Sequence, residues 1–597
     1  MTINVGEVIA VRGVNITLRI FDESNKDILF HQGKKLKGIS IREFITIQRG
    51  FKDIVCIVEG EYLDESRYEI DGTERVTFTR KVEVKPIGYF DNGAFIEGIK
   101  YLPMIKDQVF LASEDQIKCV FGKENNENGF VIGDLLKEDL AVSLPWKKLF
   151  NSHIGIFGNT GSGKSNTLTN LYTTLFKQKK ENILGKSQFV VLDFNGEYTK
   201  NQLIDGNDKK VYSLSTKNNE GDKFPIHAEE FWNTETLCLL FKATANTQTP
   251  FIKRVVKGRN KFKQSANSLT NYVKKTFEKN FMAQSQKREA VDLLISVARI
   301  INNNPLESKL SNLSWHGQHS CFYIGNTYFS GGDTGAYSSI FEEHVNNINI
   351  QNLNFFEELI LRINLQLVND LLSGYVQFEH IQPLLKRIEA LALTLAQVIE
   401  VKETINDNNL LTVISLRQCT QEVKKVIPLL LAKHYYEHHK THVSTPPDRT
   451  VHLIIDEAHN ILSQQSLREE ESWKDYRLEL FEEIIKEGRK FGFFLTLSSQ
   501  RPADISPTIM SQVHNFFIHR LVNDRDLFLL DNTISTLDSL SKSMIPNLSK
   551  GCCIVTGTAF DLPLLIQVRL LTKTQQPDSE DVDLEILWAT NDEGTQH

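Results

Sequence analysis

A glycine-rich segment carries the clearest chemistry in the chain. It matches the pattern G-x-x-x-x-G-K-[ST] and consists of Gly158, Asn159, Thr160, Gly161, Ser162, Gly163, Lys164 and Ser165. Small residues let backbone N–H groups converge on phosphate oxygens, and the N-terminus of a following helix adds the positive end of its dipole. A structural glycine turn is the alternative, but an apolar run before the segment and a helix predicted from Asn166 to residue 177 favour a nucleotide-binding loop.

Two residues of this loop have predicted roles. Lys164 would reach the β- and γ-phosphates of ATP, and the hydroxyl of Ser165 would help to hold Mg²⁺. The sequence therefore predicts ATP and Mg²⁺ as the cofactors.

A pair of adjacent carboxylates ends a second apolar run, at residues 451–455. Asp456 is placed to support Mg²⁺ through water, and Glu457 to orient and deprotonate the attacking water. A strand followed by an acidic helix cap is the alternative, and the phosphate loop favours the catalytic interpretation. His459, which completes the string D-E-A-H, is expected to pack locally.

A third apolar run, residues 493–497, is followed by Ser498, Ser499 and Gln500. An amide at this point can sense the γ-phosphate or hold the attacking water. A turn residue is the alternative, and the position of Gln500 after the phosphate loop and the acidic strand favours a sensor.

The elements that must position these residues are short, nearly continuous apolar runs. Such runs are typical of strands buried on both faces in a parallel sheet covered by helices. They span residues 153–157, 189–193, 411–416, 451–455 and 493–497. The predicted fold class is α/β.

The periodicity of the chain predicts four regions. Residues 1–145 mix β-branched and polar residues between short Gly, Asn and Asp clusters, which predicts a small antiparallel β-barrel. Residues 229–405 keep a helical periodicity for too long to be a loop, which predicts a helical insertion. Residues 146–228 and 406–572 then form the α/β core, and residues 573–597 form an acidic tail.

Taken together, the motifs resemble those of the HerA family of hexameric P-loop ATPases, relatives of the FtsK-type DNA translocases. Beyond the phosphate loop the resemblance rests on the strings Asp193-Phe194-Asn195-Gly196-Glu197-Tyr198, Asp456-Glu457-Ala458-His459, Glu487-Gly488-Arg489-Lys490-Phe491-Gly492 and Ser499-Gln500-Arg501-Pro502. It covers nearly the whole chain and implies a RecA-like core. Asn195 replaces a usual His, and Ser152-His153 stand where the family often has a basic residue, so a cation acting within the same subunit is in doubt.

The resemblance also implies a homo-hexameric ring with ATP between subunits. Arg489 would then reach the neighbour's nucleotide, where a planar guanidinium suits the spread charge of phosphoryl transfer. A helix is predicted over residues 475–490, with Gly488 and Gly492 bracketing its end so that Arg489 projects. A surface arginine at a helix C-terminus is the alternative.

Charge is unevenly distributed along the chain. The 68 Lys and Arg and 75 Asp and Glu give a net charge of −7. The seven acids that follow Lys573 account for all of it. Since Leu584, Ile586, Leu587 and Trp588 lie among those acids, we expect the tail to pack on a neighbouring subunit or on the nucleotide cleft; a solvated end is the alternative.

The best local indication of nucleic-acid binding is the segment 251–263. Its six bases, with no acid between them, are Lys253, Arg254, Lys257, Arg259, Lys261 and Lys263. Repeated around a ring, they would grip phosphates of double-stranded DNA in the channel without reading bases. A solvated helix face explains the segment equally well. A second cluster, Lys34, Lys35 and Lys37, is weaker, and nothing resembles a sequence-reading DNA-binding motif.

The seven cysteines include no C-x-x-C pair, which argues against a zinc or iron–sulfur site and for a reducing compartment. No apolar run approaches the 18–20 residues of a membrane helix. We therefore expect a cytoplasmic protein without membrane contact.

The predicted function is an ATP-dependent hexameric DNA translocase or helicase. Through the resemblance, it would work with a partner nuclease or sirtuin-like NAD hydrolase docked on the N-terminal barrel, in DNA end processing or antiphage defence. The alternative is a ring-shaped scaffold that assembles and regulates that effector, with translocation secondary. A conjugative DNA-pumping ATPase fits less well, because a membrane segment is missing.

Overall fold

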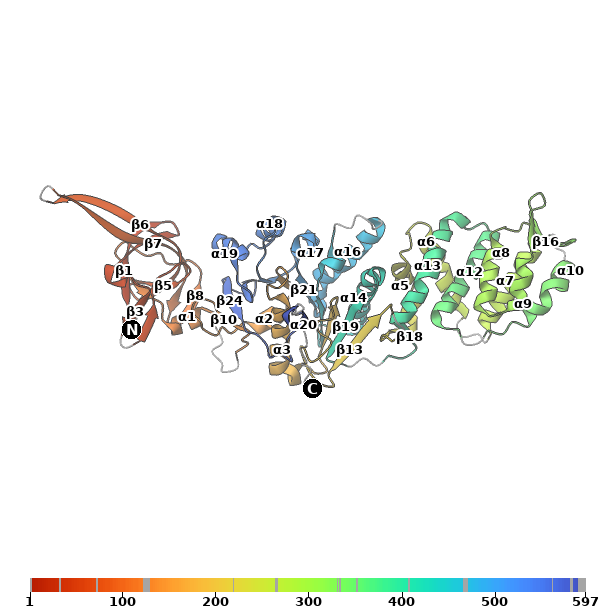
Figure 1. Ribbon diagram of the computed structural model, residues 1–597, viewed down its shortest axis with the longest axis horizontal. Helices are drawn as coiled ribbons and strands as arrows, with labels where there is room; N and C mark the ends of the chain where they lie inside the picture. Colours follow the sequence, from red (N-terminus) through yellow and green to blue (C-terminus); the bar gives the residue numbers. More distant parts are fainter. Residues whose placement is uncertain are drawn as a thin grey trace, which may run out of the picture. The chain divides into compact units, whose positions relative to one another are not determined.

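The computed structural model places the chain in two compact units (Figure 1), which are described separately. Unit 1 comprises Met1–Leu184, Asn201–Ile204 and Phe494–His597, and unit 2 comprises Gly185–Lys200 and Asp205–Phe493. The structure describes residues 3–31, 34–70, 73–121, 129–217, 220–262, 267–329, 331, 334–350, 353–405, 409–464, 471–560, 562–579 and 584–588. Among these residues, no helix has the length and apolar character needed to cross a bilayer.

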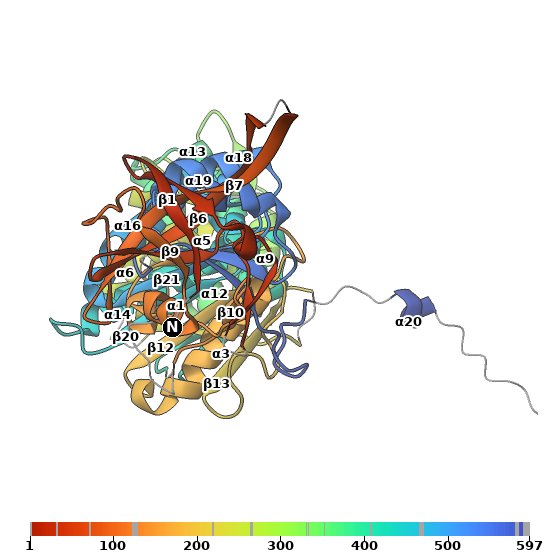
Figure 2. The same ribbon diagram turned by 90° about the vertical axis from the view of Figure 1, so that its left-hand side faces the viewer.

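Unit 1 opens with a seven-stranded antiparallel sheet, whose strands lie in front in Figure 2. Its order is β2-β1-β9-β5-β6-β7-β8, and β2 also pairs with β7. Branched and aliphatic residues at every second position of β2, such as Ile16 and Leu18, are fully buried, as the two-residue period of a strand requires. The strands are β1 (Asn4–Arg12), β2 (Asn15–Ile20), β5 (Phe44–Arg49), β6 (Lys52–Ile70), β7 (Thr73–Asp91), β8 (Ala94–Glu97) and β9 (Gln108–Leu111).

A long arm extends from this sheet where β6 and β7 continue past their neighbours. The pairings described for β2 with β7 involve residues 81–84 of β7, and those of β5 with β6 involve residues 52–57 of β6. Beyond them β6 and β7 pair with each other up to Ile70 and Thr73, and Figure 1 shows this two-stranded arm projecting from the sheet.

Further strands of unit 1 belong to the predicted α/β core. They lie in the order β10-β24-β23-β22-β11-β21, and β11 is parallel to both of its neighbours. Every residue of β11 is buried, and α3 packs against it, as its continuous apolar run predicts. The elements are β10 (Gly133–Leu135), β11 (Ile154–Phe157), α3 (Lys164–Ile183), β21 (Phe493–Ser499), β22 (Asn515–Ile518), β23 (Cys552–Gly557) and β24 (Leu564–Val568).

Unit 2 contains four parallel strands in the order β20-β12-β19-β13. The apolar runs of β12 and β20 are buried almost throughout, which confirms that they are two-sided core strands. The elements are β12 (Ser187–Asp193), β13 (Lys209–Ser215), β19 (Leu411–Gln418), α14 (Gln421–His442) and β20 (Thr450–Ile455).

Helices dominate unit 2 between β14 (Phe224–His227) and β18 (Ile399–Lys402) (Figure 1). Among them, α12 (Phe355–Leu372) begins at a capping box formed by Asn354 and Glu357. It contacts α6, α7, α8 and α13 and is the central helix of this group. The others are α5 (Thr234–Phe241), α6 (Gln248–Phe262), α7 (Ser268–Met282), α8 (Ala290–Ile300), α9 (Asn304–Ser311) and α13 (Phe378–Val398).

Candidate nucleotide-binding site

The glycine-rich loop joins the end of β11 to the start of α3 in unit 1. Gly161 (φ +72°) and Gly163 (φ +113°) adopt left-handed backbone conformations that favour glycine. A Cβ on Gly158 would lie 2.5 Å from Cβ of His519, and one on Gly163 would lie 2.9 Å from Cα of Gly551. Glycine therefore allows the backbone turn at positions 161 and 163, and it allows His519 and Gly551 to approach the loop closely.

Lys164 is the first residue of α3, and its side chain is buried although it carries a charge. Ser165 follows in the first turn and is half-buried. This places an ammonium and a hydroxyl at the positive end of a 20-residue helix, which is the arrangement that binds phosphate and its metal ion. The side-chain amide of Asn166, the next residue, donates to the backbone carbonyl of Arg569 at 3.1 Å.

His519 packs against the glycine-rich loop, a contact that no sequence motif indicates. Its backbone N–H donates to the carbonyl of Phe157 at 2.7 Å, and its Nε2 lies 2.9 Å from the hydroxyl of Thr167. Complete burial, assisted by the charge of Lys164, lowers the pKa of His519 to about 3. The ring is therefore neutral near pH 7 and acts as a packing and hydrogen-bonding group.

Gln500 lies against the phosphate loop. The hydroxyl of Thr160 donates to Oε1 of Gln500, and the N–H of Gly158 donates to the carbonyl of Ser499 at 3.3 Å. The end of β21 is thus bonded to the loop at two points, so a shift of one is transmitted to the other.

A cavity of about 190 Å³ opens beside the loop. It is lined by Asn159, Thr160, Gly161, Ser162, Arg520, Val522, Leu548 and Lys550. Arg520 and Lys550 are exposed cations that the motif analysis did not select. Their positions, just after β22 and just before β23, were a usable signal, because the end of a strand lies beside the start of its antiparallel neighbour.

The residues before β11 have structural contacts. Ser152 donates to the carbonyl of Leu149 at 2.7 Å, and Nδ1 of the fully buried His153 accepts from the N–H of Leu495 at 3.0 Å. Neither supplies a cation, so within the described part of unit 1 Arg520 and Lys550 are the basic side chains lining the loop's cavity.

In unit 2 the two predicted acids end β20, and both are buried. Glu457 has φ +50°, a left-handed conformation that is costly for a residue with a long side chain, by about 1–3 kcal/mol. Its carboxylate lies 3.3 Å from Nδ1 of His459, and its N–H donates to Asp456 at 3.1 Å. The sharp turn directs Glu457 away from the course of the strand, which is typical of a strained functional position.

The string D-F-N-G-E-Y forms a turn in contact with Asp456. The Asp193 carboxylate accepts backbone N–H groups from Gly196, Glu197 and Tyr198 at 2.7, 3.1 and 3.0 Å. The Tyr198 hydroxyl donates to Asp456 at 3.4 Å. Burial, with the nearby Asp456 charge, raises the pKa of Asp193 to about 6.

Arg489 lies on a 3-10 turn, Gly488–Phe491, which follows α16 (Glu471–Glu487). The predicted helix was to continue to residue 490; the α-helix ends at Glu487, because the chain tightens toward Gly492 (φ +75°). Gly488 is buried, and a Cβ there would lie 2.9 Å from the carbonyl of Phe493. Arg489 itself is exposed on this turn.

The structure divides the basic segment 251–263 into two sets. Arg254 pairs with the buried Asp370 at 2.8 Å, and the buried Arg259 stacks 4.7 Å from the Trp232 ring. Lys253, Lys257 and Lys261 are exposed on α6, and Lys263 lies outside the described residues. The segment is thus partly structural and partly a cationic surface.

The other charged segments have fewer described contacts. Lys37 pairs with Asp139 at 3.0 Å, and the side chains of Lys34 and Lys35 lie outside the description. In the tail, α20 (Leu584–Trp588) is described, with Leu587 and Trp588 exposed; the remaining acids beyond residue 579 lie outside the description.

Comparison with known proteins gives one consistent result. Residues 130–369 match the family model described as "Helicase HerA, central domain". A probable helicase of Methanocaldococcus jannaschii is 24% identical over 489 residues, covering 81% of this chain and 78% of that protein. A probable DNA double-strand break repair helicase HerA of the same organism is 24% identical over 544 residues, covering 87% and 92%.

Two further similarities are more limited. The DNA double-strand break repair helicase HerA of Pyrococcus furiosus is 31% identical over 145 residues, 23% of this chain and 24% of that protein. Among solved structures, VirB4 of Thermoanaerobacter pseudethanolicus matches with a TM-score of 0.42 and 11% identity, over 76% of this chain and 99% of that chain.

Proposed function

We infer that this chain, a HerA-type ATPase, converts ATP hydrolysis into movement along DNA as a homo-hexameric ring. The observation that carries the inference is the glycine loop, in which a buried ammonium meets the start of a long helix and the sensor amide is bonded to the loop. A phosphate chain fits here, because the loop leads into the N-terminus of a 20-residue helix and two cations line the adjoining cavity.

Each residue has a proposed part in hydrolysis. Lys164 and the loop N–H groups hold the phosphates, and Gln500 senses them through Thr160. Glu457 removes the proton of the attacking water, and Tyr198 and the Asp193 turn keep Asp456 in place. Ser165 and Asp456 would hold Mg²⁺, which supplies charge neutralisation on the phosphates when bound. The assignment of both motifs to one reaction rests on their pairing in the sequence.

Arg520 and Lys550 extend the proposed machinery. Both line the cavity next to the loop, so either cation can contact an anionic group there. They supply, within the same subunit, the positive charge that Ser152 and His153 lack. Arg489 would serve the neighbouring subunit, as developed in the Discussion.

The function predicts that duplex DNA raises the ATPase rate of the natural chain and that particles of hexamer mass carry that activity. We expect Lys164→Ala to lower the DNA-stimulated rate by on the order of 10²–10³-fold, because a preorganised charge on the phosphates is lost. Phosphate release with and without duplex DNA, together with light scattering on the same sample, measures both quantities.

Lys177→Ala is the matched control, since Lys177 is an exposed lysine on the same helix and bonds Gln575 at 3.1 Å. It should keep the natural rate. A hexamer that hydrolyses ATP without any response to DNA, yet binds an effector, would replace translocation by the scaffold function. Natural turnover in Lys164→Ala would refute both.

The partner proposal concerns the N-terminal sheet, which we take to be a closed barrel, and its arm. In the β6–β7 register Leu63 faces Arg80, and Glu65 faces Phe78, so Leu63, Val76 and Phe78 share one face of the arm. Their side chains are 65%, 43% and 61% exposed. Apolar residues clustered on an exposed two-stranded arm favour contact with another protein. We propose this face as the docking surface for a nuclease or sirtuin-like NAD hydrolase.

Substituting Leu63→Ser, Val76→Thr and Phe78→Ser together should therefore abolish association with the proposed nuclease or NAD-hydrolase partner and leave ATP binding intact. The control carries Ser66→Ala, Thr77→Ala and Thr79→Ala on the opposite face of the same arm. Size-exclusion chromatography of the two purified proteins measures association. Persistent association of the first variant would refute the docking surface.

A further inference from the structure

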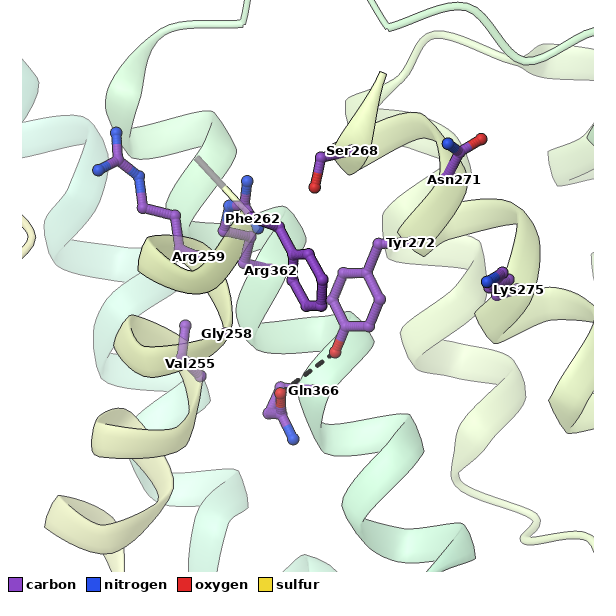
Figure 3. A pocket seen from close by; sticks show the side chains of 10 residues that line it. All are labelled: Val255, Gly258, Arg259, Phe262, Ser268, Asn271, Tyr272, Lys275, Arg362 and Gln366. Carbon is purple, nitrogen blue, oxygen red and sulfur yellow. Dashed lines mark hydrogen bonds between the residues drawn. The ribbon is translucent and has the colours of Figure 1, made fainter. Parts of the chain in front are cut away.

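A second cavity, of about 410 Å³, lies among the helices of unit 2, far along the chain from the phosphate loop (Figure 3). Residues of α6, α7 and α12 line it, and none of them has a part in the proposed hydrolysis. The lining comprises Val255, Gly258, Arg259, Phe262, Ser268, Asn271, Tyr272, Lys275, Arg362 and Gln366.

The charged lining residues of this cavity are all cations. Arg362 bonds Glu358 at 2.6 Å, and Arg259 lies 3.8 Å from the same carboxylate oxygen. Two guanidinium groups thus share one carboxylate, and the Lys275 ammonium, from α7, adds a third positive charge. The lining of the cavity is therefore positively charged, and a guanidinium fork suits phosphate.

Two aromatic rings stand among these cations. Figure 3 shows Phe262 and Tyr272 together in the middle of the group, with the polar side chains around them. The Tyr272 hydroxyl donates to Oε1 of Gln366 at 3.2 Å, and Nε2 of Gln366 donates to Asp370 at 2.8 Å, which fixes the ring of Tyr272. Phe262 is 48% exposed at the end of α6, so its ring is accessible from solvent.

A row of lysines leads along α6 to Phe262. Lys253, Lys257 and Lys261 are four residues apart and exposed, so they lie on one face about 6 Å from each other along the helix axis. The ammonium of Lys261 lies 5.3 Å from the centre of the Phe262 ring. A cationic row that ends at an exposed aromatic ring is the combination used to bind a single strand, phosphates on the cations and bases on the rings.

We propose that this cavity receives one unstacked nucleotide of a single-stranded nucleic acid, with its base against Phe262 and Tyr272 and its phosphates on Arg362, Lys275 and the α6 lysines. The inference rests on the proposed function, because it identifies where a motor that opens or tracks DNA would hold a strand. A nucleotide in a strand and a free mononucleotide share this chemistry. An acidic peptide would use the cations but not the rings.

The test uses the full-length chain without added ATP. A fluorescein-labelled oligothymidylate reports affinity by anisotropy, and a second oligomer carrying 5-iodouracil is photo-crosslinked and the modified peptide identified by mass spectrometry. We expect the crosslink at Phe262 or Tyr272. Phe262→Ala should weaken binding about 10-fold, as loss of one stacked base predicts. Tyr375→Ala, which removes another exposed aromatic ring of the same helical region, should leave affinity unchanged.

Salt dependence separates the rings from the lysines. Lys257→Ala should lower the slope of log affinity against log salt concentration by about 1, whereas Phe262→Ala should leave that slope unchanged. Because both side chains are exposed, neither variant removes a core contact.

The possible results distinguish a strand-binding site from its alternatives. Equal affinity of Phe262→Ala and the natural chain, or a crosslink outside the cavity, overturns the inference. If millimolar thymidine monophosphate competes the crosslink away, the site is assigned to free nucleotides. That result supports the same recognition of base and phosphate, with a mononucleotide in place of a strand. Competition by polyglutamate as effective as by DNA of equal charge overturns it in favour of an acidic peptide. A correct crosslink without duplex-stimulated ATPase would instead refute the translocase and leave the strand site standing.

Discussion

Glu457→Gln is expected to lower the turnover number for ATP by about 10²- to 10⁴-fold and to leave ATP binding near that of the natural chain. The glutamine keeps the volume of the side chain but cannot take a proton from water. The left-handed turn that holds Glu457 is formed by the backbone and by Asp456, so it survives this change. The variant should therefore bind ATP normally but hydrolyse it slowly.

Equilibrium binding of a fluorescent ATP analogue and single-turnover hydrolysis measure the two quantities on one preparation. Glu479→Gln, the same chemical change at an exposed position of α16, should match the natural chain in both. A Glu457→Gln variant that turns over at the natural rate would remove Glu457 from the role of general base. Loss of binding without a change in turnover per bound ATP would assign it to nucleotide affinity.

Arg489→Ala is expected to reduce turnover by about 10³- to 10⁵-fold, the range for an arginine that completes a phosphoryl-transfer site from a neighbouring subunit. The 3-10 turn between Gly488 and Gly492 holds this exposed guanidinium at a fixed point of the surface. Lys490→Ala is the matched control, since Lys490 is an adjacent exposed cation that pairs with Glu487 at 2.7 Å.

Mixing two inactive chains tests the action between subunits. An Arg489→Ala chain keeps its own phosphate loop, and a Lys164→Ala chain keeps its arginine. In a ring with head-to-tail interfaces, random mixing in equal amounts should restore about a quarter of the natural sites. Mixtures as inactive as either variant alone would contradict the assignment of Arg489, provided that light scattering shows rings of full mass.

Local sequence signals predicted most of the elements, because they depend on short stretches of chain. Continuous apolar runs predicted the buried strands β11, β12 and β20. The predicted helix ended three residues later than α16 does. The chain instead forms a 3-10 turn before Gly492, where Gly488 packs closely against the carbonyl of Phe493, and the sequence pattern does not reveal that contact.

Residues that act through distant partners could not be found in this way. His519 looks like any histidine after an apolar strand until burial and Thr167, 352 positions away in the chain, define its role. The six bases of segment 251–263 form one group in the sequence, but in the structure Arg254 pairs with Asp370 and the buried Arg259 lies against the Trp232 ring. Composition and spacing contain no information about these contacts.

The sequence by itself determined which residues are proposed to carry the chemistry: a glycine-rich loop, two adjacent acids, an amide after a strand and an arginine between two glycines, each specified by residue type at fixed spacing. Only the tertiary structure decided which charges remain available and where cavities form. Arg520 and Lys550, which follow and precede different strands, line the cavity beside the loop. Arg362 and Lys275, from different helices, line the cavity that contains the two aromatic rings. The physical reason is that backbone preferences act over a few residues, whereas burial and electrostatic pairing depend on segments that only folding brings together.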